Sequence, residues 1–262
     1  MLLTLEVGNT NTKVGVYEGS RLVVSWRLTT RREQTADEYG LFIETLLRTR
    51  GLTPASIHGA AISNVVPPVQ QALEWACDKY FGVTPLSVEP GVNTPIPLNV
   101  DNPREVGPDR VVKAVAAVAI YGPPLIIVDL GTATTFDCVN ARGEFIGGAI
   151  APGIATAADA LLNRAARLFR VELVRPKDAI GRNTVHNVQS GLVHGWAGLV
   201  DGIVERMKAE MDGTPRVVAT GGHASLIVNV ARSIQEVHEH LAFEGLRLMW
   251  ERANPAGGGH GR

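Results

Sequence analysis

Two short segments of this chain share one plan, and that repeat constrains the fold more than any other feature. Glu6–Thr12 reads Glu-Val-Gly-Asn-Thr-Asn-Thr, and Asp129–Thr135 reads Asp-Leu-Gly-Thr-Ala-Thr-Thr. In each, an apolar run ends in a carboxylate, an apolar residue and a glycine, and hydroxyl and amide side chains follow. A further glycine turn comes after each segment, at Gly19 and Gly143. The chain is therefore predicted to consist of two halves that are built alike.

Hydrophobic periodicity places the expected elements around this repeat. Each half is predicted to open with strands joined by glycine turns, and helices follow. Strands are predicted at residues 2–6, 12–17, 22–28, 57–63, 125–130 and 216–220, and helices at 35–50, 68–80, 106–119, 154–168, 185–211 and through 241–250. Four prolines between residues 89 and 103 predict an extended or looping stretch, and a stretch of this length in a compact protein is often functional.

Charge and cysteine content exclude several classes of protein. The 262 residues carry 25 basic and 26 acidic side chains, so no overall field draws the chain to nucleic acid or to an acidic membrane. Cys77 and Cys138 lie far apart without metal-ligand spacing, which favours a reducing compartment. No stretch approaches the roughly 20 apolar residues of a membrane span. A cytoplasmic protein with no nucleic-acid or membrane partner is expected.

A carboxylate at a strand end before a glycine turn is suited to binding phosphate and metal. Backbone N–H groups at the glycine can approach phosphate oxygens, and a carboxylate can hold Mg²⁺ directly or through water. Two such turns facing each other would clamp the phosphates of a nucleotide, and Lys13 could pair with one of them. The alternatives are ordinary turns and a solvated lysine. Neither turn has the pattern of a P-loop, and no GxGxxG follows a strand, so P-loop and Rossmann folds are disfavoured.

The segment Asn102–Arg110 ends the proline-rich stretch and begins a predicted helix. Asp109 would lie in the first helical turn, where a capping carboxylate is the alternative interpretation. Phosphoryl transfer needs a carboxylate that accepts or orients the proton of the attacking hydroxyl, and Asp109 is a candidate for that role. Arg110 could bind a substrate carboxylate with two hydrogen bonds.

Glycine-rich segments precede three further elements. Gly147–Gly153 and Gly181–Thr184 lead into helices whose N-termini could receive an anion, and ordinary loop glycines are the alternative. Gly221-Gly222 ends a strand and would admit a flat ring such as adenine against the backbone. The histidines show no zinc-binding spacing, and no nucleophile motif is present, so covalent catalysis has no support.

The order and spacing of these motifs resemble those of type III pantothenate kinases over about residues 5–250. The motifs that carry the resemblance are Glu6–Thr10 with Lys13, Asn102-Pro103, Gly107–Arg110, Asp129–Thr135, Gly147–Ala149, Gly181–Thr184 and Gly221-Gly222. The resemblance implies an α/β fold of two duplicated ribonuclease H-like domains of the actin-like ATPase type, with mixed five-stranded sheets flanked by helices. The expected domains are 1–117 and 118–235, with a helix at 236–253 packing back on the first domain and a disordered tail at 254–262.

The resemblance also implies a reaction, the ATP-dependent phosphorylation of pantothenate to 4'-phosphopantothenate at the start of coenzyme A synthesis. Asp109 would be the catalytic proton acceptor, and a homodimer partner would help to complete the site. The residues expected to bind ATP are Glu6, Gly8, Asn9, Thr10, Lys13, Gly131, Thr132, Gly221 and Gly222. Those expected to bind pantothenate are Val100, Gly107, Pro108, Asp109, Arg110 and Thr184. Mg²⁺ is expected at Glu6, directly or through water, and a monovalent cation, K⁺ or NH₄⁺, at Asp129.

Two residues depart from the family pattern. Glu6 stands where the family normally has aspartate, and Val100 stands where it usually has tyrosine. These departures keep a second hypothesis open, a catalytically weak or inactive nucleotide-binding paralogue with a regulatory role. A third is an enzyme of the same superfamily that acts on another hydroxylated acid or on a phosphoanhydride, because a fold alone does not fix the substrate.

Overall fold

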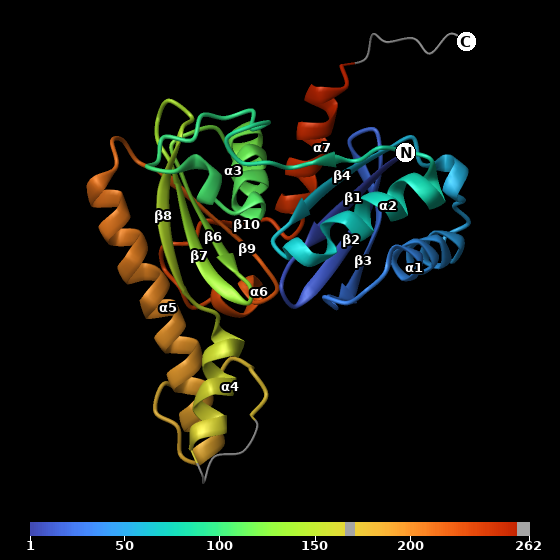
Figure 1. Ribbon diagram of the computed structural model, residues 1–262. Helices are drawn as coiled ribbons and strands as arrows, with labels where there is room; N and C mark the ends of the chain where they lie inside the picture. The colour runs from blue at the N-terminus through green and yellow to red at the C-terminus, as the bar shows by residue number, and fades with distance from the viewer. Residues whose placement is uncertain (166–170, 256–262) are drawn as a thin grey trace. The chain divides into compact units, whose positions relative to one another are not determined.

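The computed structural model describes residues 1–165 and 171–255, and it divides the chain into two compact units (Figure 1). The first unit comprises Met1–Pro95, Asp101–Ala116 and the chain from Leu241 onward. The second comprises Ile96–Val100 and Ala117–His240. Each unit has its own sheet and its own buried core.

The sheet of the first unit has five strands. They are β1 (Leu2–Val7), β2 (Asn11–Glu18), β3 (Arg21–Thr29), β4 (Gly59–Asn64) and β5 (Leu86–Ser87), in the spatial order β3-β2-β1-β4-β5. β1 pairs antiparallel with β2, and β2 antiparallel with β3, whereas β4 lies parallel to both β1 and β5. The predicted three-strand meander is confirmed, and the sheet is mixed.

Helices cover both faces of this sheet. The helices of the unit are α1 (Ala36–Arg48), α2 (Gln70–Phe81), α7 (Leu241–Ala253) and the first part of α3 (Pro108–Tyr121). Every residue of β1 is buried, and because successive side chains of a strand point to opposite faces, both faces must be covered. Leu3 and Leu5 join the cluster that includes residues of α1 and α2, whereas Leu2 packs with Phe243 of α7.

The second unit repeats the same sheet. Its strands are β6 (Leu125–Leu130), β7 (Ala133–Val139), β8 (Phe145–Pro152), β9 (Arg216–Thr220) and β10 (Glu236–Val237), in the order β10-β9-β6-β7-β8. β6–β7 and β7–β8 are antiparallel, and β6–β9 and β9–β10 are parallel. The pairing of each strand matches its counterpart in the first unit. The predicted internal duplication and the predicted α/β fold class are therefore confirmed.

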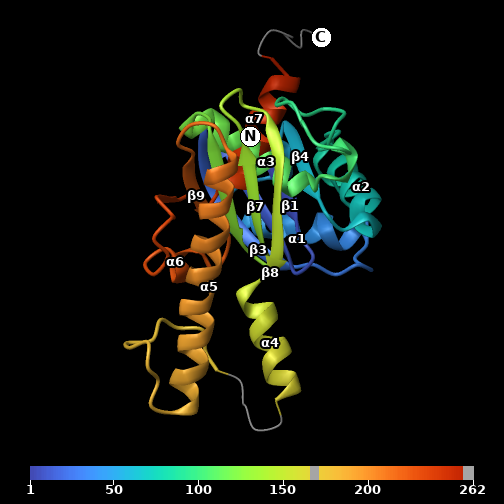
Figure 2. The same cartoon turned by 90° about the vertical axis from the view of Figure 1, so that its left-hand side faces the viewer.

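Two helices of the second unit form a projecting arm. They are α4 (Ile154–Arg164) and α5 (Thr184–Glu210), and a short helix, α6 (Ala224–Ile227), follows β9. α4 leaves the end of β8 and runs away from the sheet, and α5 begins at the tip and runs back toward it (Figures 1 and 2). We call α4, the N-terminal part of α5 and residues 171–183 the arm.

The predicted helices and strands are found with shifts of a few residues at their ends. The structure also contains β5, β10 and α6, which the sequence did not predict. Part of the predicted helix 154–168 lies outside the described residues. The tail from residue 256 also lies outside them. The proline-rich stretch is irregular apart from a short 3₁₀ turn at Pro103–Glu105. Both cysteines are buried, and no helix in the described ranges is long and apolar enough to cross a membrane.

Candidate functional site

The first glycine turn joins β1 to β2 and places an ion pair at its base. Glu6 of β1 is the register partner of Lys13 of β2, and the Lys13 Nζ donates to Glu6 Oε2 at 2.8 Å. The Glu6 side chain is 11% exposed and that of Lys13 is 31% exposed. One oxygen of the Glu6 carboxylate is thus engaged by an ammonium group, so a Mg²⁺ ion fits this donor set better through water than by direct coordination.

The backbone of this turn is held by hydrogen bonds. The Gly8 N–H donates to the Asn11 carbonyl at 2.9 Å, and beyond β3 the Thr30 hydroxyl donates to the Gly8 carbonyl at 2.7 Å. The Thr30 N–H donates to the Thr10 carbonyl at 3.0 Å. Asn9 and Thr10 are exposed at the tip. The turn is therefore anchored at its base, and its polar tip is exposed.

The second glycine turn joins β6 to β7 and is anchored differently. The Gly131 N–H donates to the Ala133 carbonyl at 3.0 Å. The Thr132 carbonyl accepts from the Gly153 N–H at 3.1 Å and from the Thr156 hydroxyl at 2.8 Å. Thr132 itself is exposed. The start of α4 thus holds the backbone of the turn in place.

Gly221 lies directly against the carboxylate of Asp129. A Cβ atom on Gly221 would stand 2.3 Å from Asp129 Oδ1 and 2.6 Å from the Leu130 carbonyl carbon, and its φ is +96°. The neighbouring His223 N–H donates to the Leu130 carbonyl at 3.0 Å. Only glycine fits this position. The parallel pairing of β6 and β9 therefore brings Asp129, Gly131 and Gly221 together in one place.

Gly153 belongs to this group, although the sequence marked it only as part of a glycine-rich segment that leads into a helix. A Cβ atom there would lie 2.4 Å from the carbonyl oxygens of both Gly131 and Thr132. Its position before α4 lets the backbone approach the turn closely. The signal that could have found it is the Pro-Gly pair at the end of a strand and the start of a helix.

Asp109 occupies the first turn of α3, as predicted, and is paired with a lysine that the sequence did not single out. The Lys113 Nζ donates to Asp109 Oδ2 at 3.0 Å. The Asp109 side chain is 28% exposed, whereas that of Lys113 is 2% exposed. A Cβ atom on Gly107 would stand 2.6 Å from Asp109 Oδ1, so Gly107 leaves room for the carboxylate. The signal that could have found Lys113 is its position four residues after Asp109 on the same helix, where the two side chains are neighbours.

The electrostatic surroundings keep Asp109 ionised. Burial alone would raise the pKa of this carboxyl group. The Lys113 ammonium, its hydrogen bond and the backbone N–H of Arg110 outweigh burial, and the net pKa lies below its ordinary value. An ionised carboxylate at neutral pH is the state that can accept a proton. Pro108 is the first residue of α3, where its missing N–H costs nothing, and Arg110 is half-buried.

Val100 lies in the second unit, beside β8. A Cβ atom on Gly147 would be 3.9 Å from Val100 Cγ1, and Gly147 has a φ of +113°. The preceding Asn99 N–H donates to the Phe145 carbonyl at 2.8 Å. The residue that replaces the tyrosine of the family pattern is thus in van der Waals range of a glycine position on the edge of the sheet.

Thr184 lies apart from the second glycine turn of the same unit. It is the exposed first residue of α5, and Asn183 caps the helix by accepting from the His186 N–H at 2.9 Å. α5 begins at the tip of the arm (Figures 1 and 2). The 11 residues of α4 separate that tip from Gly153 by roughly 16 Å at the usual helical rise. One copy of the chain does not bring Thr184 to Thr132.

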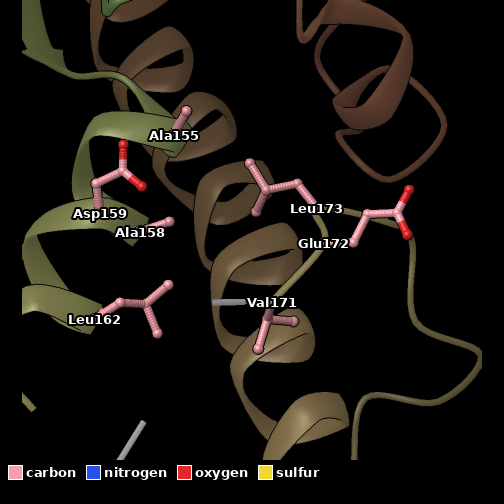
Figure 3. A pocket seen from close by; sticks show the side chains of 7 residues that line it. All are labelled: Ala155, Ala158, Asp159, Leu162, Val171, Glu172 and Leu173. Carbon is pink, nitrogen blue, oxygen red and sulfur yellow. The ribbon is translucent and has the colours of Figure 1, made fainter. Parts of the chain in front are cut away.

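The arm carries a cavity of about 410 Å³, between α4 and the segment after it (Figure 3). Two acidic residues are among those that line it, Asp159 of α4 and Glu172 of the opposite segment, and the Glu172 carboxylate points away from α4 in Figure 3. Its other lining residues are Ala155, Ala158, Leu162, Val171 and Leu173. None of the residues predicted to bind ATP or pantothenate lines it. Within the described part of the chain, no three His, Cys, Asp or Glu side chains are grouped to hold a metal ion unaided.

Sequence comparisons with known proteins give a family match. The sequence profile of the type III pantothenate kinases matches residues 2–206. The type III pantothenate kinase of Geobacter sulfurreducens is 52% identical over 252 residues, which cover 96% of this chain and 99% of that protein. The enzyme of the same name from Syntrophotalea carbinolica is also 52% identical, with the same coverage.

Solved structures agree on the fold. A protein from Sinorhizobium meliloti described as a 2-dehydro-3-deoxygalactonokinase matches with a TM-score of 0.61 at 11% identity, covering 97% of each chain. At that identity the match supports the actin-like ATPase and sugar-kinase fold only. The sequence profile and the two relatives identify the family: the chain belongs to the type III pantothenate kinases.

Proposed function

We propose that this chain transfers the γ-phosphoryl group of ATP to pantothenate, giving 4'-phosphopantothenate, with Asp109 as the proton acceptor. The observation that carries the role of Asp109 is its ionised, lysine-paired carboxylate in the first turn of α3. In the reaction, the 4'-hydroxyl oxygen forms a bond to the γ-phosphorus while the bond from that phosphorus to ADP breaks. The hydroxyl proton passes to Asp109. Catalysis of this kind depends mainly on positioning and charge stabilisation.

Nucleotide binding is assigned to the two glycine turns. In the first turn, the proposed contacts to phosphate are the backbone and side chains at Gly8, Asn9 and Thr10, with Lys13 as a cation. In the second unit they are Gly131 and Thr132, and Gly221-Gly222 would receive the adenine. What supports this is the exposed polar tip of each turn on an anchored backbone.

Cations complete the proposed site. Mg²⁺ would neutralise the transferred phosphates, and Glu6 would hold it through water because Lys13 engages one of its oxygens. K⁺ or NH₄⁺ would bind at Asp129, whose carboxylate lies against the backbone of Gly221. Oxygen donors of this kind suit hard cations.

Pantothenate is assigned to the segment around Asp109. Arg110 would pair with its carboxylate, and Gly107 and Pro108 would line the site. Val100 would contact the substrate in place of the tyrosine of the family pattern. Thr184 is too far from the second glycine turn to act with it in one chain, so we assign it to the site of a partner subunit in a homodimer.

A homodimer of this kind would use the arm. Apolar side chains are exposed there at Leu161, Val174 and Ile180. Light scattering of the purified protein measures the mass directly, and a monomer at assay concentration would contradict the assignment. The proposed location of the enzyme is the cytoplasm, where coenzyme A synthesis would take place.

The test is the Asp109→Asn variant. It should lower kcat by about 10²–10⁴-fold, the usual contribution of a general base, and change the Kd for ATP far less. The matched control is Asp78→Asn, an exposed aspartate on α2, which should turn over like the wild type. Unchanged kcat in Asp109→Asn would remove Asp109 from the chemistry. ATP binding without turnover in the wild type would favour the regulatory paralogue.

A further inference from the structure

Lys113 is a buried cation to which the assignments above give no role in catalysis beyond keeping Asp109 ionised. Its side chain is 2% exposed, and it lies in the middle of α3. A buried ammonium group loses its hydration, and proteins keep one only where a charged partner offsets that loss. An apolar side chain would fill the same space without this cost. The chain therefore retains a charge where packing alone would not call for one.

The contrast with Lys79 shows how unusual this pair is. Lys79 Nζ donates to Asp37 Oδ1 at 2.7 Å, but the two side chains are 62% and 58% exposed. Water screens that pair, so it contributes little. The Lys113–Asp109 pair has nearly the same N–O distance, 3.0 Å, with the ammonium buried. Its electrostatic effect on the carboxylate is correspondingly stronger.

The two carboxylate oxygens of Asp109 have different neighbours. Oδ2 accepts from Lys113. Oδ1 lies against Gly107, where a Cβ atom would stand 2.6 Å from it, and the backbone N–H of Arg110 also donates to this carboxylate. Lys113 and Arg110, both on α3, are charged groups that lower the pKa of this carboxyl group. α7 packs on the same helix at Gly245, whose backbone lies against the Val112 carbonyl.

We propose that Lys113 is a positioning residue for phosphoryl transfer: its buried ammonium fixes Asp109 Oδ2, which leaves Oδ1 to accept the proton of the attacking hydroxyl. This rests on the role proposed above for Asp109. The ammonium stays protonated throughout, and the only proton that moves is that of the hydroxyl, which passes to Oδ1 as the new oxygen–phosphorus bond forms and the bond to ADP breaks. A fixed carboxylate needs no reorientation when the substrate arrives.

The experiment is the pH dependence of kcat in the Lys113→Met variant. Methionine keeps an unbranched side chain of similar length and removes the charge. An opposite charge at this distance lowers a carboxyl pKa by about 1–3 units, so its removal should move the acid limb of the profile up by about 1–3 pH units. kcat should fall most at low pH and recover as pH rises, while KM for ATP changes little. An acid limb at the wild-type pH would overturn the proposal.

Two controls separate this from weaker explanations. Lys79→Met removes the exposed ion-paired lysine and should leave the whole profile unchanged; a shift there equal to that of Lys113→Met would overturn the proposal. Asp109→Asn in the same assay tests the role on which the proposal rests. If Asp109→Asn turns over like the wild type, the role of Asp109 fails; if it is inactive while Lys113→Met keeps the wild-type profile, only the role of Lys113 fails.

A measurement on the unaltered protein covers the case in which Lys113→Met does not fold. Carbon-13 NMR of the Asp109 carboxyl group in the wild type follows its titration directly. Asp109 should titrate below the range of an ordinary aspartate. Titration at or above that range would overturn the proposal whatever the variant does.

Discussion

The two glycine turns occupy the same place in two matching sheets, yet they surround their carboxylates differently. In the first unit, Glu6 is the register partner of Lys13, and the two form an ion pair at 2.8 Å. In the second unit, Asp129 is the register partner of Thr135, and Gly221 of the neighbouring strand end lies against its carboxylate. The strand order and the directions of pairing are the same in both.

The difference would suit a duplicated scaffold to the two tasks proposed above. The sheet fixes the position of each carboxylate, because Glu6 and Asp129 are each the next-to-last residue of the central strand of their sheet. The residues around it then decide what it can do. A carboxylate paired with a lysine on the next strand is suited to organising phosphates and hydrated Mg²⁺. A carboxylate that lies against glycine backbone is suited to holding a bare cation among oxygen atoms.

The largest effect should come from Gly221→Ala, which breaks the close contact in the second unit. The new Cβ would meet backbone atoms of Leu130 as well as Asp129, and the φ of +96° disfavours any side chain. Backbone strain alone is worth roughly 1–3 kcal/mol, and the contact adds to it. The thermal unfolding midpoint should fall, and the Kd for ATP should rise.

The matched control for Gly221→Ala is Gly19→Ala. Gly19 has a φ of +57°, but a Cβ there would meet nothing within 4 Å. The Gly19→Ala variant therefore isolates the effect of backbone conformation, which should lower the free energy of unfolding by about 1 kcal/mol. Equal losses of stability and ATP affinity in the two variants would mean that the contact with Asp129 does not matter.

A smaller effect is expected from Lys13→Met, which removes the ion pair of the first unit. Glu6 would keep a mostly buried carboxylate without its ammonium partner, and the proposed phosphate contact would be lost. Charged hydrogen bonds contribute about 1.5–3 kcal/mol, so KM for ATP should rise by about 10- to 100-fold. Steady-state kinetics measures this, with Lys79→Met as the control. A KM equal to the wild type would remove Lys13 from the nucleotide site.

The smallest effect should follow Glu6→Asp, which restores the aspartate of the family pattern. The carboxylate would retreat by about one C–C bond, roughly 1.5 Å, and the long flexible stem of Lys13 can follow it. kcat/KM should change by less than about tenfold, the equivalent of 1.4 kcal/mol. Glu18→Asp, at an exposed pair with Arg21, is the control. A loss of activity beyond that limit would show that the reaction requires the longer side chain of Glu6.

The sequence predicted the architecture well because its signals are local. Paired motifs and apolar runs predicted the duplicated sheets, and both are confirmed by the strand order. β5 and β10 were missed because two residues are too few to show periodicity. α6 was missed for the same reason, since it has four residues.

The site was harder to predict because its key contacts join distant parts of the chain. Gly221 was marked as a possible ring-binding glycine, but its contact with Asp129 depends on the pairing of β6 with β9. Lys113 would be taken for a solvated helix residue from sequence alone, and only the structure shows it buried. Thr184 was assigned through the resemblance, and its place at the tip of the arm could not be read from the motif.

The most direct test of the whole account is the product of the reaction. Purified protein would be given ATP, Mg²⁺ and K⁺, with and without pantothenate, while ADP release is followed and the product is identified by mass. The account predicts ADP release that depends on pantothenate, with one phosphopantothenate formed for each ADP. ATP binding with no pantothenate-dependent ADP release, even at saturating pantothenate, would contradict it.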